Sequence, residues 1–377
     1  MLIRGRLFAP APRGNVLIEV SGDRVTAIEP VASDAPAPAG ALGGPDSVIT
    51  PGFIDVQVNG AFGQDFSDPS ADVALVSRGL AAFGVTAYVA TVITSPLERY
   101  PAVLDHLAAA SSGPDGARLL GVHLEGPFLS PRQPGTHTPT WLREPSIELV
   151  NGWLDRAPVR IMTLAPELPG ALELVRALVA RDVVVSLGHT DASWDQAAAA
   201  ASAGARMGTH LFNGMRHFDH HHPSVVNFLL SSDLAVGVIA DGVHVDRRVL
   251  DLVSRMASPD RLVVVTDALA GLGMPEGDFR LAGVELVSDG VVGRRRDGTL
   301  SGSLLPLDHA ISDLITAGMD PEQAFRAVTV NPARVLGLDG SMGSVAVGRT
   351  ADLVILDPGW RSSVTIVGGQ VAYAGIR

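Results

Sequence analysis

The sequence predicts an α/β fold: a (β/α)8 TIM-like barrel with a small β-sandwich domain built from both termini. From Pro51 onward, strand-like apolar runs alternate with Ala- and Leu-rich helical stretches, which indicates βα units and a parallel sheet. Each end of the chain has only short β-like runs, too few for a sheet with its own core. With 377 residues, 46% of them hydrophobic, the chain can bury a barrel of about 250 residues and a smaller domain.

The expected elements follow one another in a regular order. The N-terminal β-like runs are at residues 2–8, 16–20 and 24–29, and a connection rich in Ala, Pro and Gly follows at 31–46. Eight barrel strands are expected at residues 53–58, 85–94, 118–124, 159–165, 183–188, 205–211, 235–240 and 261–267. Helices are expected at residues 70–83, 97–110, 170–181, 193–203, 246–257, 303–317 and 321–336. The chain then returns to β-like runs at residues 343–345, 351–356, 364–367 and 370–373.

These elements predict three segments. Residues 1–50 begin the small β domain, residues 51–342 form the barrel, and residues 343–377 complete the small domain. In a barrel of this kind the active site lies at the C-terminal ends of the strands, so polar residues at those ends are the first candidates for function.

The composition excludes several classes of function. The net charge is -12 and the basic residues form no block, so we expect no nucleic-acid partner. The chain has no cysteine, which excludes disulfides and thiolate metal sites, and no lysine, which excludes a Walker phosphate loop and a Schiff base. No run approaches the length of a membrane span, so we expect no membrane contact and a cytoplasmic protein.

Three strand ends carry side chains that could bind a metal. Glu125, His189 and His210 each follow an apolar run. A single glutamate or histidine in such a place is more often structural, but three at three strand ends favour a metal site. Glutamate with two histidines suits a catalytic zinc that keeps one position open for water. Ferrous iron would also accept this set of ligands.

Further candidates surround this set. Asp267 ends the eighth strand, where a carboxylate could take a proton from water and return it to a leaving amine. It could instead cap a helix, but residues 268–271, Ala-Leu-Ala-Gly, are a poor helix start. His244 at the seventh strand end and His137 in a Pro- and Gly-rich loop could contact a substrate or polarise a carbonyl. The alternative for both, an exposed loop imidazole, is stronger for His137.

With these residues in view, the chain resembles the N-acetylglucosamine-6-phosphate deacetylases of the amidohydrolase superfamily. The resemblance covers nearly the whole chain, and the His-Leu-Glu-Gly-Pro-Phe motif at residues 123–128 with Gly-Thr-His at 135–137 is specific to that family. Other matching motifs lie at residues 51–55, 188–190, 209–213, 239–244, 265–268, 300–303, 331–333 and 348–354. The resemblance implies hydrolytic removal of acetate from N-acetylglucosamine 6-phosphate.

The resemblance also implies roles for particular residues. Glu125, His189 and His210 would hold one divalent metal, Asp267 would act as general base and then acid, and His137 would polarise the acetyl carbonyl. The sugar or phosphate would contact Asn213, Gly214, His244 and Ser303. These enzymes are usually dimers, so we expect a homodimer that binds a small amino-sugar phosphate.

Two departures from the superfamily pattern affect the prediction. Where many amidohydrolases place His-x-His for a second metal, this chain has Gln57 and Asn59, so we expect one metal per chain, with the amides facing the substrate phosphate. His221 stands where the family has an arginine that reaches the partner subunit's phosphate, and Arg216 could substitute. The alternatives are therefore a deacetylase for N-acetylgalactosamine 6-phosphate or for the non-phosphorylated sugar, or a barrel that binds an amino-sugar phosphate without catalysis.

Overall fold

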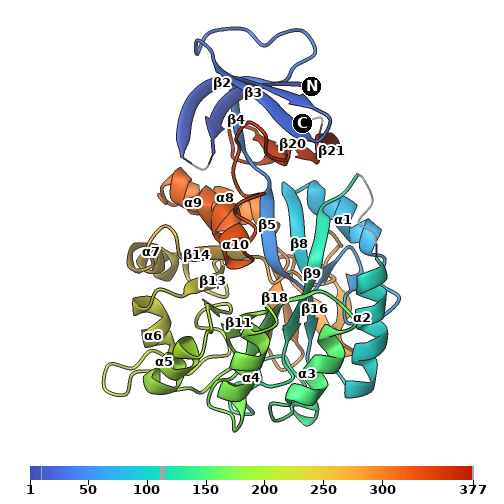
Figure 1. Ribbon diagram of the computed structural model, residues 1–377, viewed down its shortest axis with the longest axis vertical. Coiled ribbons are helices and arrows are strands. Elements are labelled where there is room, and N and C mark those ends of the chain that lie inside the picture. The colour runs from blue at the N-terminus through green and yellow to red at the C-terminus, as the bar shows by residue number, and fades with distance from the viewer. Residues whose placement is uncertain (10, 111–114, 376–377) are drawn as a thin grey trace.

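The computed structural model describes residues 1–9, 11–110 and 115–375 and shows a barrel below a small β domain (Figure 1). Eight parallel strands of the described chain form one sheet in the order β14-β13-β12-β11-β10-β9-β8-β5. They are β5 (Phe53–Val58), β8 (Val85–Ile93), β9 (Arg118–Glu125), β10 (Val159–Leu164), β11 (Val184–Leu187), β12 (Met207–Gly208), β13 (Ala235–Ile239) and β14 (Leu262–Val265). The predicted (β/α)8 barrel is confirmed.

Backbone contacts between the first and last strands close the barrel. Val58 pairs with Ala268 in parallel, and the Asp267 N–H donates to the Gln57 carbonyl at 2.9 Å. The pairing of β5 with β8 shifts register between Asp55 and Val58. Such a bulge changes which side chains face inward, and it lies directly beside the expected site.

Helices cover the outside of the barrel and one of its ends. The helices of the βα units are α1 (Val73–Ala81), α2 (Tyr100–Ala109), α3 (Ile147–Leu154), α4 (Ala171–Val179), α5 (Trp194–Ser202), α6 (Val225–Ser231) and α7 (Arg247–Met256). Three more helices follow, α8 (Leu307–Thr316), α9 (Pro321–Val328) and α10 (Val330–Val335). Ala333 of α10 packs among interior barrel residues such as Val56 and Val263, so α10 fills the barrel end away from the site.

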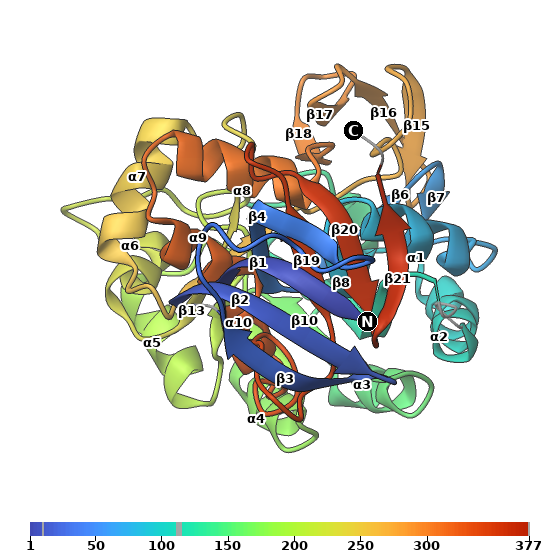
Figure 2. The ribbon, with the colours of Figure 1, turned by 90° about the horizontal axis from the view of Figure 1, so that it is seen from above.

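The small β domain is a seven-stranded sheet from both ends of the chain, in the order β21-β20-β19-β4-β1-β2-β3 (Figure 2). Its strands are β1 (Leu2–Phe8), β2 (Pro12–Ser21), β3 (Arg24–Pro30), β4 (Leu42–Pro51), β19 (Leu353–Leu356), β20 (Ser362–Val367) and β21 (Gln370–Ala374). Ile49 of β4 lies opposite Ile355 of β19, and both are buried in a separate apolar core. The small domain from both termini is thus confirmed, whereas its boundaries at residues 50 and 343 stay a prediction.

A four-stranded antiparallel sheet was not predicted. It consists of β15 (Asp278–Leu281), β16 (Val284–Ser288), β17 (Val292–Arg295) and β18 (Leu300–Ser303), and it lies to one side of the barrel in Figure 2. Smaller elements that the sequence did not suggest are the pair β6 (Gly60–Ala61) and β7 (Gln64–Asp65), the 3-10 turn Pro139–Trp141, and helices α3 and α6. The helix expected at residues 97–110 begins with a 3-10 turn at Leu97–Arg99. Residues 343–345, expected as a strand, form none; residues 343 and 344 lie in bends. None of the described helices is both long and apolar enough to cross a membrane.

An ion pair between Arg118 and Asp352 joins the barrel to the small β domain. Arg118 at the start of β9 donates from Nη1 to Asp352 Oδ1 at 3.0 Å, and its second guanidinium nitrogen contacts the other carboxylate oxygen. The Asp352 side chain is 7% exposed and accepts one backbone bond, from Gly368 at 2.8 Å. We expect Arg118→Met to leave a buried carboxylate under-paired and to lower the free energy of unfolding by about 1–3 kcal/mol.

Denaturant or thermal unfolding measures this effect. The matched control is Arg248→Met, because the Arg248–Asp246 pair has side chains 91% and 49% exposed. Its loss should change stability by less than about 0.5 kcal/mol. Equal effects of the two substitutions would contradict a role for Arg118 in joining the domains.

Candidate active site

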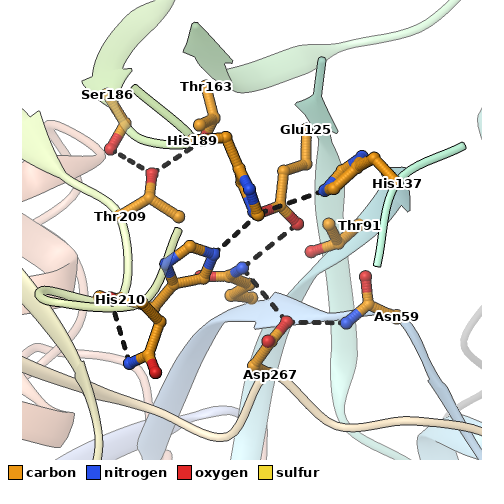
Figure 3. Close-up of polar contacts among 12 residues, drawn as sticks. Asn59, Thr91, Glu125, His137, Thr163, Ser186, His189, Thr209, His210 and Asp267 are labelled. Atoms are coloured by element: carbon orange, nitrogen blue, oxygen red, sulfur yellow. Dashed lines mark hydrogen bonds and ion pairs between the residues drawn. The ribbon is translucent and has the colours of Figure 1, made fainter. Parts of the chain in front are cut away.

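Three donor atoms converge at the C-terminal ends of the barrel strands (Figure 3). The Glu125 Oε1 atom lies 3.0 Å from His189 Nε2 and 2.9 Å from His210 Nε2. All three side chains are buried. Burial alone would raise the pKa of Glu125, but hydrogen bonds with His137, His189 and His210 hold it well below its usual range. The predicted ligands therefore meet as an ionised carboxylate and two imidazoles.

The backbone turns sharply where it presents these groups. His189, His210 and Asp267 each lie two residues beyond a strand end and have left-handed φ angles of 47°, 28° and 50°. Residues other than glycine seldom adopt this region, at a cost of about 1–3 kcal/mol each, and they concentrate at functional sites. Each strand thus ends at the edge of the cavity, and the strained turn that follows it points the side chain of His189, His210 or Asp267 into the cavity.

The His189 ring is fixed on several sides. Its Nδ1 lies 3.0 Å from the Gln133 carbonyl oxygen, which can only accept, so Nδ1 carries the hydrogen and Nε2 is free to bind a metal. A Cβ atom on Gly214 would lie 2.6 Å from His189 Nδ1, and one on Gly135 would lie 2.9 Å from its Cε1. These glycines let two loops close on the ring, so Gly214 is needed for the metal ligand whether or not it touches substrate.

Two amides hold one oxygen of Asp267. Asn59 Nδ2 donates to Asp267 Oδ1 at 2.7 Å, and Gln57 Nε2 donates to the same oxygen at 3.1 Å and to Glu125 Oε2 at 3.3 Å (Figure 3). Burial, and then the charge of Glu125, raise the pKa of Asp267 to about 6. Residues 268–271 form no helix, so Asp267 is not a helix cap. Both amides bond to Oδ1, and none of the described residues forms a hydrogen bond with Oδ2, which is therefore available for proton transfer.

His137 is buried rather than exposed. Its Nδ1 lies 2.8 Å from Thr94 Oγ1 and accepts from the Thr94 backbone N–H at 3.4 Å, so the hydrogen is on Nε2. That Nε2 lies 3.9 Å from Glu125 Oε1. Burial, and then the nearby His189, lower the pKa of His137 to about 4, so the ring is neutral at pH 7. A neutral imidazole with Nε2–H is a donor suited to a substrate carbonyl oxygen.

His244 is oriented by a carboxylate three residues earlier. Its Nδ1 lies 2.7 Å from Asp241 Oδ2, and the backbone N–H groups of Val243 and His244 donate to Asp241 Oδ1 at 2.9 and 2.8 Å. Burial opposes ionisation of Asp241, but these bonds with His244 lower its pKa. Nδ1 therefore donates to the carboxylate, and the other ring nitrogen is left for a ligand.

A chain of buried polar groups lies beneath the metal ligands. His123 Nδ1 lies 3.2 Å from the Val56 carbonyl oxygen and must donate to it. Burial lowers the pKa of His123 to about 4, so the ring is neutral and its Nε2 accepts from the Thr163 hydroxyl at 2.7 Å. Thr163 in turn accepts from Thr209 at 2.7 Å, and Thr209 from Ser186 at 2.6 Å. Each hydroxyl therefore donates in the same direction.

The cavity that these groups border has a volume of about 210 Å³. Nine of the predicted site residues line it: Asn59, Glu125, His137, His189, His210, Asn213, Gly214, His244 and Asp267. Leu281 and residues 299–301, from the unpredicted sheet, complete the wall, and Ser301 donates to Thr136 Oγ1 at 3.0 Å. Gln57 is buried behind this lining.

Besides Gln57, two other predicted substrate residues do not border the cavity. The Ser303 hydroxyl accepts from the Leu305 N–H at 3.0 Å and does not border the cavity. His221 is exposed and lies with Arg216 and Trp194 at a second, open hollow of about 600 Å³. Their contacts with substrate stay predictions.

Sequence reasoning missed the residues that orient the others. Thr94, Gln133 and Asp241 hold the rings of His137, His189 and His244. Only Asp241 had a usable signal, its position three residues before a candidate histidine. Gln133 acts through its carbonyl oxygen, which any residue could provide.

Comparison with known proteins identifies the family. A sequence model of the family described as "Amidohydrolase family" matches residues 48–373. The chain belongs to the amidohydrolase family. N-acetylglucosamine-6-phosphate deacetylase of Bos taurus is 41% identical over 344 residues, which are 86% of this chain and 83% of that protein. N-acetylgalactosamine-6-phosphate deacetylase of Escherichia coli O157:H7 is 34% identical over 361 residues, 94% of each chain.

Solved structures agree with this assignment. A point mutant of N-acetyl-D-glucosamine-6-phosphate deacetylase from Mycobacterium smegmatis, in complex with N-acetyl-D-glucosamine-6-phosphate, has a TM-score of 0.92 at 32% identity and covers 99% of both chains. The Thermotoga maritima deacetylase has a TM-score of 0.87 at 28% identity over 100% of both chains. The resemblance drawn from the motifs and the prediction of a hydrolase of this family are confirmed.

Gly214→Ala tests how the His189 ring is held. The new methyl group would lie 2.6 Å from His189 Nδ1, so we expect the ring to move and the metal affinity to fall at least about tenfold. Metal content after dialysis against a chelator measures this. Gly22→Ala is the matched control, because Gly22 has nearly the same φ, 58° against 59°, but no atom within 4 Å of the added Cβ. Similar metal loss in both variants would contradict the packing argument.

Proposed function

We propose that this chain hydrolyses N-acetylglucosamine 6-phosphate to glucosamine 6-phosphate and acetate. The observation that carries the proposal is the convergence of Glu125, His189, His210 and Asp267 on one cavity. This set suits attack of water on an amide carbon. The substrate comes from the relatives, since a 41% identical protein bears the name of this deacetylase.

The cofactor we propose is one divalent metal ion per chain, zinc or alternatively ferrous iron. The donor atoms of Glu125, His189 and His210 all lie within 4.8 Å of one another, and they are of the kinds that both metals accept. When bound, such an ion lowers the pKa of water and polarises a carbonyl oxygen. Among the described residues this is the single cluster of potential ligands, in keeping with Gln57 and Asn59 donating to carboxylates through their amide nitrogens.

Proton transfer falls to Asp267. Its Oδ1 accepts from two amides, while Oδ2 takes the proton of the attacking water. The same carboxyl group then protonates the amine as the C–N bond breaks, which returns Asp267 to the ionised form. A carboxyl group whose pKa is raised toward neutrality serves both steps, because it neither holds nor releases the proton too strongly.

His137 stabilises the developing negative charge on the acetyl oxygen. Its Nε2–H group lines the cavity next to the metal ligands, and Thr94 prevents the ring from turning over. Donors fixed before the reaction need no rearrangement when charge develops, which is why they lower the barrier.

The sugar and phosphate extend from this centre. We assign the hydroxyl contacts to His244, Asn213 and the backbone of Gly214, which line the cavity. We further propose a homodimer in which His221, with Arg216 beside it, reaches the phosphate bound by the partner subunit. A cytoplasmic location follows from the same proposal, since a doubly charged phosphate does not cross a membrane unaided.

The galactosamine epimer is the second candidate substrate. A relative that is 34% identical over 94% of both chains is named N-acetylgalactosamine-6-phosphate deacetylase. The two sugars differ at one hydroxyl, so the metal site and Asp267 would serve both equally. Discrimination between the two substrates would depend on the residues that contact this hydroxyl of the sugar.

Asp267→Asn tests the proton-transfer role. The substitution keeps the shape and the bonds to the two amides but removes the basic oxygen. We expect kcat to fall by about 10²–10⁴ while the metal content stays near one ion per chain. Acetate release and metal analysis on the same preparation measure the two quantities. Retained activity would show that another group is the base.

Substrate comparison tests the phosphate and the epimer. We expect kcat/KM for N-acetylglucosamine 6-phosphate to exceed that for the galactosamine epimer and for the plain sugar. His221→Ala should lower it about tenfold for the phosphorylated sugar only, and His221→Arg should restore it, because guanidinium pairs well with phosphate. His220→Ala serves as the control. Preference for the plain sugar would overturn the phosphate assignment.

A further inference from the structure

Four polar side chains form a hydrogen-bonded network inside the barrel. They are His123 on β9, Thr163 on β10, Ser186 on β11 and Thr209 just beyond β12, which are four adjacent strands. Figure 3 shows three of them, Thr163, Ser186 and Thr209, beside the metal ligands. The hydrogen bonds join His123 Nε2 and Thr163 Oγ1 at 2.7 Å, Thr163 Oγ1 and Thr209 Oγ1 at 2.7 Å, and Thr209 Oγ1 and Ser186 Oγ at 2.6 Å. None of the four is more than 1% exposed.

Each ligand is close in sequence to a member of this network. His123 lies two residues before Glu125, Ser186 three residues before His189, and Thr209 immediately before His210. At its far end the network is anchored on β5, where the Val56 carbonyl oxygen accepts from His123. The network thus joins all three ligand-bearing strand ends to the strand that carries Gln57.

Packing of the barrel interior does not by itself require hydroxyl groups at these positions. Barrel interiors are usually filled by branched apolar residues, and valine has the shape of threonine. An unpaired buried hydroxyl is costly. Each of these hydroxyls finds its partner only when the neighbouring strands are in one particular register, so that register is favoured. The hydroxyls therefore favour one relative placement of the strand ends.

The hydrogen-bonded side chains also pack against the backbone next to the metal ligand His189. A Cβ atom on Gly188 would lie 2.8 Å from Thr163 Cγ2 and 2.8 Å from Thr209 Cβ. Both threonines therefore press against the residue that precedes His189, where the backbone enters its left-handed turn. Movement of either threonine would move the peptide that presents the His189 ring.

We propose that Thr163, Thr209, Ser186 and His123 are positioning residues that set the donor atoms of Glu125, His189 and His210 for the metal. The inference rests on the metal site of the proposed function but not on its substrate. It makes the hydrogen-bonded network a determinant of metal affinity, although none of its hydroxyls bonds to a ligand side chain.

The test compares Thr209→Val with Thr209→Ser. Valine removes the central hydroxyl, so we expect the affinity for Zn²⁺, measured by chelator competition, to fall about tenfold. We also expect the visible spectrum of the Co²⁺-substituted protein to change. Serine keeps the hydroxyl and should restore both. Ser186→Ala removes the donor at the end of the network and should cause a smaller loss of Zn²⁺ affinity. It replaces Thr209→Val as the test if the valine variant does not fold.

Thr365→Val is the matched control. Thr365 is also fully buried and its hydroxyl pairs with Ser362 Oγ at 3.0 Å, but it lies in the small β domain. It should lower stability without changing metal affinity or the spectrum. Unchanged metal affinity in both Thr209→Val and Ser186→Ala would overturn the inference. Wild-type protein that binds one metal ion but releases no acetate would count against the proposed function alone.

Discussion

The site depends on holding two buried carboxylates together without an arginine. Glu125 and Asp267 are 2% and 5% exposed, and among the described residues no basic side chain other than histidine lines their cavity. Imidazoles stabilise the charge on Glu125, and two amides support Asp267, whose pKa is nevertheless raised. A divalent cation balances such a pair better than any of these neutral donors. The electrostatics of the cavity therefore favour the divalent ion proposed for these ligands.

Precise placement comes from the backbone more than from side-chain packing. Three of the four central residues follow their strands in left-handed turns, and glycines allow neighbouring loops to close on the His189 ring. Strain of this kind persists only when the surroundings determine the geometry strongly. The barrel provides that determination, because β11 and β12 are paired on both sides and the Asp267 N–H, just beyond β14, bonds to the Gln57 carbonyl of β5.

The sequence predicted the barrel and the central residues because both follow simple rules. Apolar runs of strand length alternated with helical stretches, and the chemically active residues stood where those runs ended. The pattern of the β15–β18 sheet is weak because its strands are only four or five residues long and β15 and β16 are partly exposed. Residues 300–303 matched a family motif, and residue 303 was expected to begin a helix. The contacts of Gln57 and Asn59 were beyond sequence reasoning, since a register shift in β5 decides where they point.

The small sheet draws on both ends of the chain, and this has a consequence for synthesis. Strand β4 pairs with β19, which begins about three hundred residues later, at Leu353. During translation the N-terminal strands are made first, but one edge of β4 has no neighbour until β19 has emerged. The barrel between them can form in the meantime. The small sheet is therefore completed only after the barrel segment has been made, and until then β4 has a free strand edge open to unwanted pairing.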